Sequence, residues 1–132
     1  MVTAIHDIPG ALTANVAVPA RAAGDATASH VVFLAPFRCR VRSVAVVPAA
    51  AITGANTNYA NFNLILRPAN TELAHIDFTS GVNQAAFVPF MLYQPTAPVE
   101  LAAGTVLDLQ RELVGSGIAT PALLVVVTYE GA

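Results

Sequence analysis

The side chains of this chain that could do chemistry are few and scattered. His75 and Asp77 stand two residues apart, so on a strand both would face the same side and could bind a metal ion or each other. A metal site needs a third and a fourth ligand, and the other histidines, His6 and His30, are remote in sequence. We therefore expect a His75–Asp77 hydrogen bond on a solvated face, and no metal or other cofactor.

The residues that could act as nucleophile or acid are also poorly placed. Cys39, the only cysteine, lies between Arg38 and Arg40, whose charges could lower the pKa of its thiol. Strand alternation puts Cys39 on the opposite face from both arginines, which predicts a small core residue. Asp108 and Glu112 would share a strand face about 13 Å apart. The sequence thus predicts no convergent catalytic set, and we expect a protein that is not an enzyme.

The arginines form the clearest charge pattern in the sequence. Arg38, Arg40 and Arg42 occupy one face of a predicted strand, and adjacent like charges need solvent or negative partners. Three interpretations remain open: a solvated face, ion pairs with Asp108 and Glu112 of a neighbouring strand or copy, or contact with an acidic partner.

The composition points to a surface that is partly covered. The chain has 132 residues, which fits one domain, with 55% hydrophobic and only 11% charged residues, against about 25% charged in typical domains. Few charges are available for the surface, so we expect part of it to be buried against copies of the chain or a partner. The alternative is a surface of Ala, Thr, Asn and Pro.

Several classes of partner and location are disfavoured. The net charge is −2 and the chain has no lysine, so it lacks the basic stripe expected for nucleic-acid binding. No run of about 18 apolar residues predicts a membrane span. The first ten residues, MVTAIHDIPG, do not resemble a secretory signal.

From residue 30 onward the pattern is β throughout. About eight short apolar segments are separated by turn signals roughly every 8–12 residues, which predicts an all-β chain with a single β-sandwich or jelly-roll-like domain. In the final predicted strands Arg111 interrupts an otherwise apolar inner row. Leu107, Leu109 and Leu113 of this row are predicted to face inward. In earlier strands Cys39, Val41, Ser43 and Ala45 are predicted to share one face, and Phe62, Leu64 and Leu66 another.

Residues 1–29 differ in composition from the rest. They are rich in Ala, Pro and Gly, with weak periodicity, and the fragment ALTANVAVP could form one strand. We expect residues 1–29 to form an extended N-terminal arm and residues 30–132 to form the β-sandwich domain. The alternative for the first segment is a mobile terminus.

Three stretches together resemble a known family. They are VVFLAPFRCRVRSVAVVPAAAITGANTNY, then IDFTSGVNQAAF, then VELAAGTVLDLQRELVGSGIATPALLVVV. Their order and spacing resemble the capsid decoration (cement, or head-stabilising) proteins of tailed bacteriophages. The resemblance covers about residues 31–128 and consists of loops and strands, not of a reactive motif. The middle hairpin, LRPANTELAH, is short for that family.

The resemblance implies a function. It implies a trimeric β-sandwich module located on the outside of the virion, bound to the major capsid protein, and an N-terminal arm that extends onto the capsid. A closed trimer requires one patch to meet a different patch on the next copy. Candidate partner contacts are the three arginines Arg38, Arg40 and Arg42 and the apolar arm residues Val2, Ile5 and Ile8.

The segment AAFVPFMLYQP is the best candidate for contact between copies. Phe87, Phe90, Met91 and Tyr93 supply aromatic and methionine side chains, which are enriched in interface cores. The alternative is that they fill one end of the sandwich core.

The loop TGANTNYANF is expected to be structural. Asn and Gly tolerate left-handed backbone and Asn amides bond local backbone groups, so Asn56 and Asn58 could fix its shape without charges. Other functions remain open: a head-fibre or tail component, and a carbohydrate-binding jelly roll. The last is disfavoured because the chain has no Trp and only three Tyr.

Overall fold

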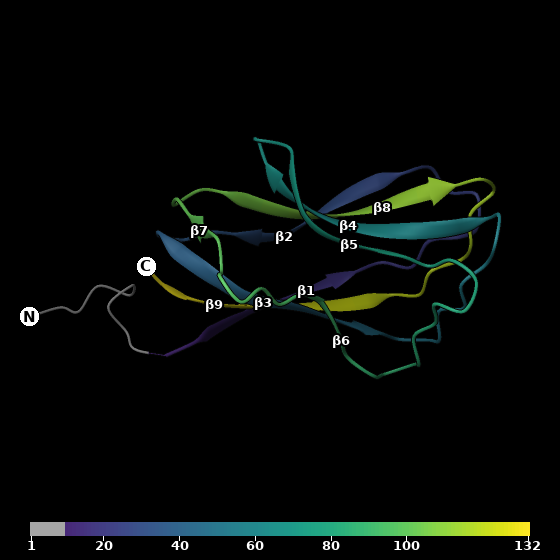
Figure 1. The fold of residues 1–132 in the computed structure, drawn as a ribbon, viewed down its shortest axis with the longest axis horizontal. Helices are drawn as coiled ribbons and strands as arrows, with labels where there is room; N and C mark the ends of the chain where they lie inside the picture. The colour runs from purple at the N-terminus through teal and green to yellow at the C-terminus, as the bar shows by residue number, and fades with distance from the viewer. Residues whose placement is uncertain (1–9) are drawn as a thin grey trace, which may run out of the picture.

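The described part of the chain is built from β-strands packed in two layers. The computed structural model describes residues 10–132, and Figure 1 shows two sheets lying face to face. The strands within residues 10–132 are β1 (Leu12–Val18), β2 (Ala28–Leu34), β3 (Cys39–Pro48), β4 (Tyr59–Arg67), β5 (Thr71–Asp77), β6 (Phe90–Tyr93), β7 (Glu100–Leu101), β8 (Val106–Val114) and β9 (Leu123–Gly131). The predicted all-β sandwich is confirmed, whereas the jelly-roll connectivity remains a prediction.

The strand order puts distant segments side by side. The first sheet has the order β1-β9-β3-β6, with the short β7 also paired to β3, and the second has the order β2-β8-β4-β5. All pairings are antiparallel. The edge strands β1 and β2 lie near each other on one side of the sandwich, and β5 and β6 lie near each other on the opposite side.

Inward-facing apolar side chains of both sheets form the core. Leu107 and Leu109 of β8 are fully buried, as predicted, and so are Phe62 and Leu64 of β4, which were predicted to share a face. The Phe62 ring also meets Phe78 edge to face at 4.9 Å between centroids. Burying each such side chain stabilises the fold by roughly 1.5–3 kcal/mol.

Strand β3 departs from simple alternation at Arg42. Cys39 and Val41 are buried as predicted, but the register with β9 shifts between Val41 and Ser43. A bulge places one extra residue in the strand and moves the following side chains to the other face. Val44 and Val46 therefore fill the core, and the prediction that Ser43 and Ala45 share the face of Cys39 and Val41 was wrong.

The sandwich begins earlier in the chain than predicted. The predicted strand within residues 1–29 exists as β1, but it pairs with β9 along its whole length and buries Val18. Residues 12–18 are therefore part of the first sheet and form its edge next to β9. The predicted arm contacts Val2, Ile5 and Ile8 lie outside the described residues.

Four connections gather at the end of the sandwich opposite the C-terminus (Figure 1). They join β1 to β2, β3 to β4, β5 to β6 and β8 to β9, and we call this the loop end. The described residues contain no helix long and apolar enough to cross a membrane.

Candidate functional site

The loops that carry the sequence resemblance hold one another in place. Asn58 accepts a hydrogen bond from the backbone N–H of Ser116 at 2.8 Å, and Asn83 accepts one from the N–H of Gly54 at 2.9 Å. A Cβ atom at Gly54 would lie 1.9 Å from the carbonyl oxygen of Thr79. These motif residues therefore tie neighbouring loops together at the loop end, whereas the sequence led us to expect Asn58 to bond local backbone groups.

The predicted interface cluster divides between the core and the surface. Phe90 and Tyr93 are half-buried and pack against the core, and the Phe90 ring lies 6.3 Å from that of Phe78. Phe87 is 74% exposed and Met91 is 53% exposed. Phe90 and Tyr93 thus fit the interpretation that this segment fills the core, and Phe87 and Met91 fit the interpretation that it contacts another copy.

Phe87 and Met91 belong to a larger apolar surface on the first sheet. The outer patch consists of Val47, Phe87, Val88, Met91 and Leu124, and a shallow hollow between Val47, Phe87 and Leu124 is almost entirely apolar. Strands β3 and β9 are apolar on both faces at the loop end, and nothing in residues 10–132 covers the outer one. An uncovered apolar sheet face is typical of an interaction surface.

Phe87 is held on this surface by an unusual backbone conformation. Its φ is +60°, and its N–H donates to the carbonyl oxygen of Pro48 at 2.8 Å. The left-handed conformation costs a bulky residue about 1–2 kcal/mol. A ring that is 74% exposed gains little packing within the chain to offset this cost. Such strain is typical of functional positions.

A second apolar surface lies at the side formed by β1 and β2. The edge patch consists of Ala14, Val16, Val31, Leu34 and Pro36. Val31 is 62% exposed and Leu34 is 60% exposed. The six large apolar side chains that are exposed in residues 10–132 all fall in these two patches.

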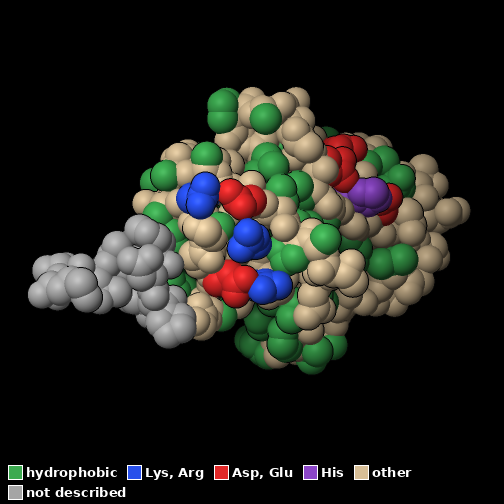
Figure 2. All heavy atoms as spheres, turned by 60° about the vertical axis from the view of Figure 1, so that its left-hand side comes forward, with side chains coloured by type: hydrophobic (Ala, Val, Ile, Leu, Met, Phe, Trp, Pro, Cys, Tyr) green, Lys and Arg blue, Asp and Glu red, His purple; other side chains and the backbone are tan. Residues whose placement is uncertain are grey.

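The predicted arginine row is ion-paired within the chain. Arg38 and Arg40 lie 3.4 and 3.3 Å from Glu100, and Arg42 lies 2.5 Å from Glu130. Figure 2 shows these basic and acidic side chains alternating along one face. Each exposed pair contributes at most about 1 kcal/mol. The three arginines and two glutamates of this row carry one positive charge in excess. Contact of the row with an acidic partner remains a prediction.

The carboxylates expected to pair with that row lie on the other sheet. Asp108 is only 3% exposed and pairs with Arg67, while Glu112 accepts hydrogen bonds from the amides of Asn61 and Asn63. The predicted pairing of the arginines with Asp108 and Glu112 was therefore wrong within the chain. The prediction failed because the arginines lie on or next to β3 in the first sheet, whereas Asp108 and Glu112 lie on β8 in the second.

The residues considered for metal binding or nucleophilic chemistry do not converge. His75 bonds Glu72 at 2.6 Å, three residues away, and not Asp77. In residues 10–132 no three His, Cys, Asp or Glu side chains gather where they could hold a metal ion. Cys39 is fully buried, as predicted, and burial raises the pKa of its thiol, which keeps it protonated.

A buried arginine at the loop end is the polar feature that sequence reasoning located but did not interpret. Arg111 faces inward, as its position in the row predicted, and is only 4% exposed. It donates to Thr120 Oγ1 at 3.3 Å and to His30 Nε2 at 3.2 Å. Burial, reinforced by Arg21, lowers the pKa of Arg111 to about 10, so the guanidinium remains charged at neutral pH.

No protein-family model matches this chain, and no curated protein or solved structure matches it either.

Proposed function

We propose that this chain is a non-enzymatic structural protein of a tailed-bacteriophage virion, a capsid decoration protein that binds the outside of the major capsid shell as a homotrimer and stabilises it. The observation that carries the proposal is the outer patch on the first sheet. A single copy leaves this patch uncovered, although the chain has few charged residues with which to keep it soluble. The family resemblance of residues 31–128 supplies the virion context.

The arrangement of the apolar surfaces suits a closed ring. A cyclic trimer joins two different patches of neighbouring copies. The outer patch spans β6, β3 and β9, and the edge patch lies at the β1 and β2 side, away from β6. The outer patch of one copy can thus meet the edge patch of the next, and the third contact closes the ring.

The loop end also fits a structural role better than a catalytic one. Its motif residues bond backbone groups of neighbouring loops, which gives a rigid surface from uncharged residues. A rigid surface loses little conformational entropy when it binds, which favours a load-bearing contact.

The proposal is tested by co-sedimentation with empty, expanded shells of the phage that encodes the chain. We expect the protein to pellet with shells, not with isolated tails, and to raise the temperature at which shells rupture. Met91→Asp should lower shell binding at least tenfold. The substitution puts a charge into the outer patch, which disfavours its burial against the next copy in the trimer that binds the shell. Thr13→Asp, an exposed change outside both patches, is the matched control and should bind like the wild type.

Three outcomes would contradict the proposal. Binding to tails alone would assign the chain to the tail, and binding to neither would remove the virion role. Equal shell binding by the wild type and Met91→Asp would exclude the outer patch from assembly.

A further inference from the structure

Phe87 carries the most exposed large apolar side chain of residues 10–132, and its backbone is fixed. Its φ is +60°, and its N–H donates to the Pro48 carbonyl oxygen at 2.8 Å, which holds the residue beside the end of β3. The ring is 74% exposed, and Val88 next to it is 51% exposed. An exposed aromatic ring on a strained backbone has the properties of an anchor that fills a pocket of a partner.

The edge patch contains a groove whose chemistry suits an aromatic ring. The groove has a volume of about 380 Å³, and no charged side chain lines it. The rings of Phe33 and Tyr129 both border it and lie 4.9 Å apart between centroids, tilted by 57°. A ring inserted into the groove can pack edge to face against these two, which is an arrangement that aromatic pairs prefer.

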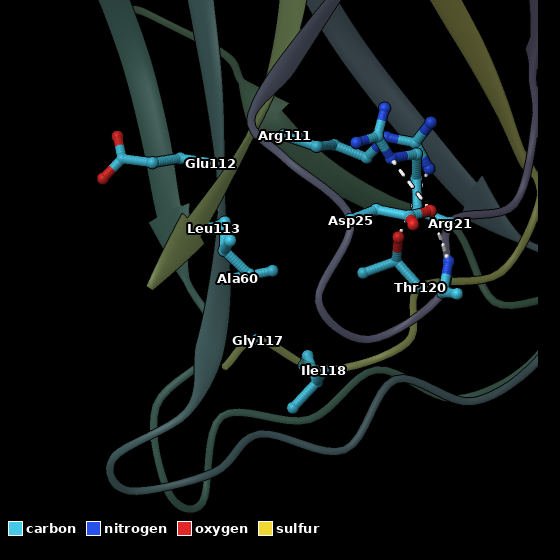
Figure 3. A pocket seen from close by; sticks show the side chains of 10 residues that line it. Arg21, Asp25, Ala60, Arg111, Glu112, Leu113, Gly117, Ile118 and Thr120 are labelled. Atoms are coloured by element: carbon cyan, nitrogen blue, oxygen red, sulfur yellow. Dashed lines mark hydrogen bonds and ion pairs between the residues drawn. The ribbon is translucent and has the colours of Figure 1, made fainter. Parts of the chain in front are cut away.

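Other hollows suit the ring less well because charged side chains border them. Figure 3 shows the one at the loop end, where Arg21, Asp25 and Arg111 come together, and its volume is only about 20 Å³. Arg38 borders the hollow beside Ala132. An apolar ring in either place would take charged groups out of water without giving them a partner.

The ring and the groove of one copy cannot meet each other. Pro48, which bonds Phe87, pairs with Leu123 at the start of β9, whereas Tyr129 lies further along that strand, about 20 Å away. Strand β6, which follows Phe87, is also at the opposite edge of the first sheet from β1. The ring can therefore fill only the groove of another copy.

The area of the two patches fits such a contact. A whole aromatic side chain offers about 150–250 Å², so the six exposed large apolar side chains, at 40–74% exposure, present on the order of 600 Å². A small specific interface buries about 1,200 Å² in total, of which about three-fifths is apolar. A contact that joins both patches thus supplies most of the apolar area that such an interface needs.

We propose that in the trimer the Phe87 ring of each copy inserts into the groove between β1 and β2 of the next copy, against Phe33 and Tyr129. This inference rests on the proposed trimer and adds the residue that anchors each contact and the groove that receives it. Leu34 of the receiving copy, which is 60% exposed, packs in return into the hollow that Phe87 borders with Leu124.

A double-mutant cycle on self-association, measured by light scattering over a range of concentrations, tests the contact. Phe87→Gly removes the ring and Ala14→Phe fills the groove, so each should weaken association at least tenfold. Because both changes remove the same contact, the double variant should associate no more weakly than the weaker single variant. Thr13→Phe, at an exposed position outside the groove, is the control and should associate like the wild type. Denaturant unfolding checks that each variant is folded.

Cross-linking tests the same contact with Phe87 in place. Cys39 is fully buried, so cysteines introduced at the surface can be linked selectively. A short bismaleimide should join copies that carry Val88→Cys and Val31→Cys into covalent trimers on a denaturing gel. Val88→Cys with Thr71→Cys, at an exposed position on β5, is the control and should not link copies.

The outcomes separate the groove contact from the proposed function. Additive losses in the cycle, or a trimeric mass without the Val88–Val31 cross-link, would overturn the groove contact and leave the proposed trimer standing. A monomer at every concentration would overturn both.

Discussion

Phe87 and His30 are the two single residues whose environments bear most directly on folding and on the proposed role. Phe87 adopts a strained conformation and exposes its ring, so its backbone strain opposes folding while its side chain is free for contact. His30 accepts a hydrogen bond from Arg111, and the charges of Arg111 and Arg21 lower the pKa of its imidazole. Neither feature could be predicted from sequence. A positive φ depends on the local turn, and His30 meets Arg111, which lies about eighty residues away in the sequence.

Replacing Phe87 by glycine should separate folding from association. Glycine adopts a φ of +60° without steric cost, and the ring lost is 74% exposed. We expect Phe87→Gly to leave the free energy of unfolding of the monomer within about 1 kcal/mol of the wild type but to weaken self-association at least tenfold. Denaturant unfolding and light scattering measure the two effects. A large loss of monomer stability would show that Phe87 serves the fold and not the interface.

The environment of His30 predicts a pH dependence of stability. Burial, then Arg111 and Arg21, lower the pKa of the imidazole, while the Asp25 carboxylate that faces the same cluster is held by Arg21. The unfolded chain therefore takes up a proton at His30, near its usual pKa of about 6.5, before the folded chain does. The stability contributed by neutral His30 is complete above that pH and is lost as the pH falls below it.

This dependence is checked by measuring Tm between pH 7.5 and pH 5. We expect the Tm of the wild type to fall across this range more than that of His30→Gln, whose amide oxygen can still accept from Arg111 but does not titrate. Parallel curves for the two proteins would contradict the assignment.

At the level of elements, sequence predicts the layers better than the contacts between them. Alternating apolar residues in β4 and β8 indicated their inward rows, because a one-sided core imposes a period of two. The bulge at Arg42 interrupted that period in β3, and the residue types of this segment did not indicate where a bulge would occur. The ion partners Glu100 and Glu130 depend on how β3 pairs with β7 and β9, which lie 60 or more residues away.

The β1 strand was placed wrongly for a different reason. Its Ala-rich surroundings and weak alternation suggested an arm, yet all seven of its residues pair with β9. Small side chains give a poor periodic signal but do not prevent a strand from pairing.

The packing of the loop end makes Gly54 sensitive to substitution. A Cβ there would lie 1.9 and 2.5 Å from the carbonyl oxygens of Thr79 and Val82. We expect Gly54→Ala to lower the free energy of unfolding by about 2–4 kcal/mol, because the loops must separate. Gly81→Ala is the control: it has open space and a φ of +86°, so it should cost only about 1–2 kcal/mol. Equal losses in denaturant unfolding would show that the β3–β4 and β5–β6 loops do not pack as described.

At the scale of the whole molecule, the apolar excess of the composition is concentrated in two places. The core takes most of the large apolar side chains, and those left exposed lie in the outer and edge patches. Composition could predict that some surface would be covered, but not which one. The location depends on strands β3, β6 and β9 coming together in one sheet. A ring of three copies would cover both patches of every copy.

The native mass in solution tests this account most directly. Light scattering over a hundredfold range of concentration should give a mass close to three times 13.6 kDa for the wild type, and a smaller mass for Met91→Asp at the same concentrations. A monodisperse monomer at every concentration would contradict the trimer and leave the outer patch without a role in association between copies.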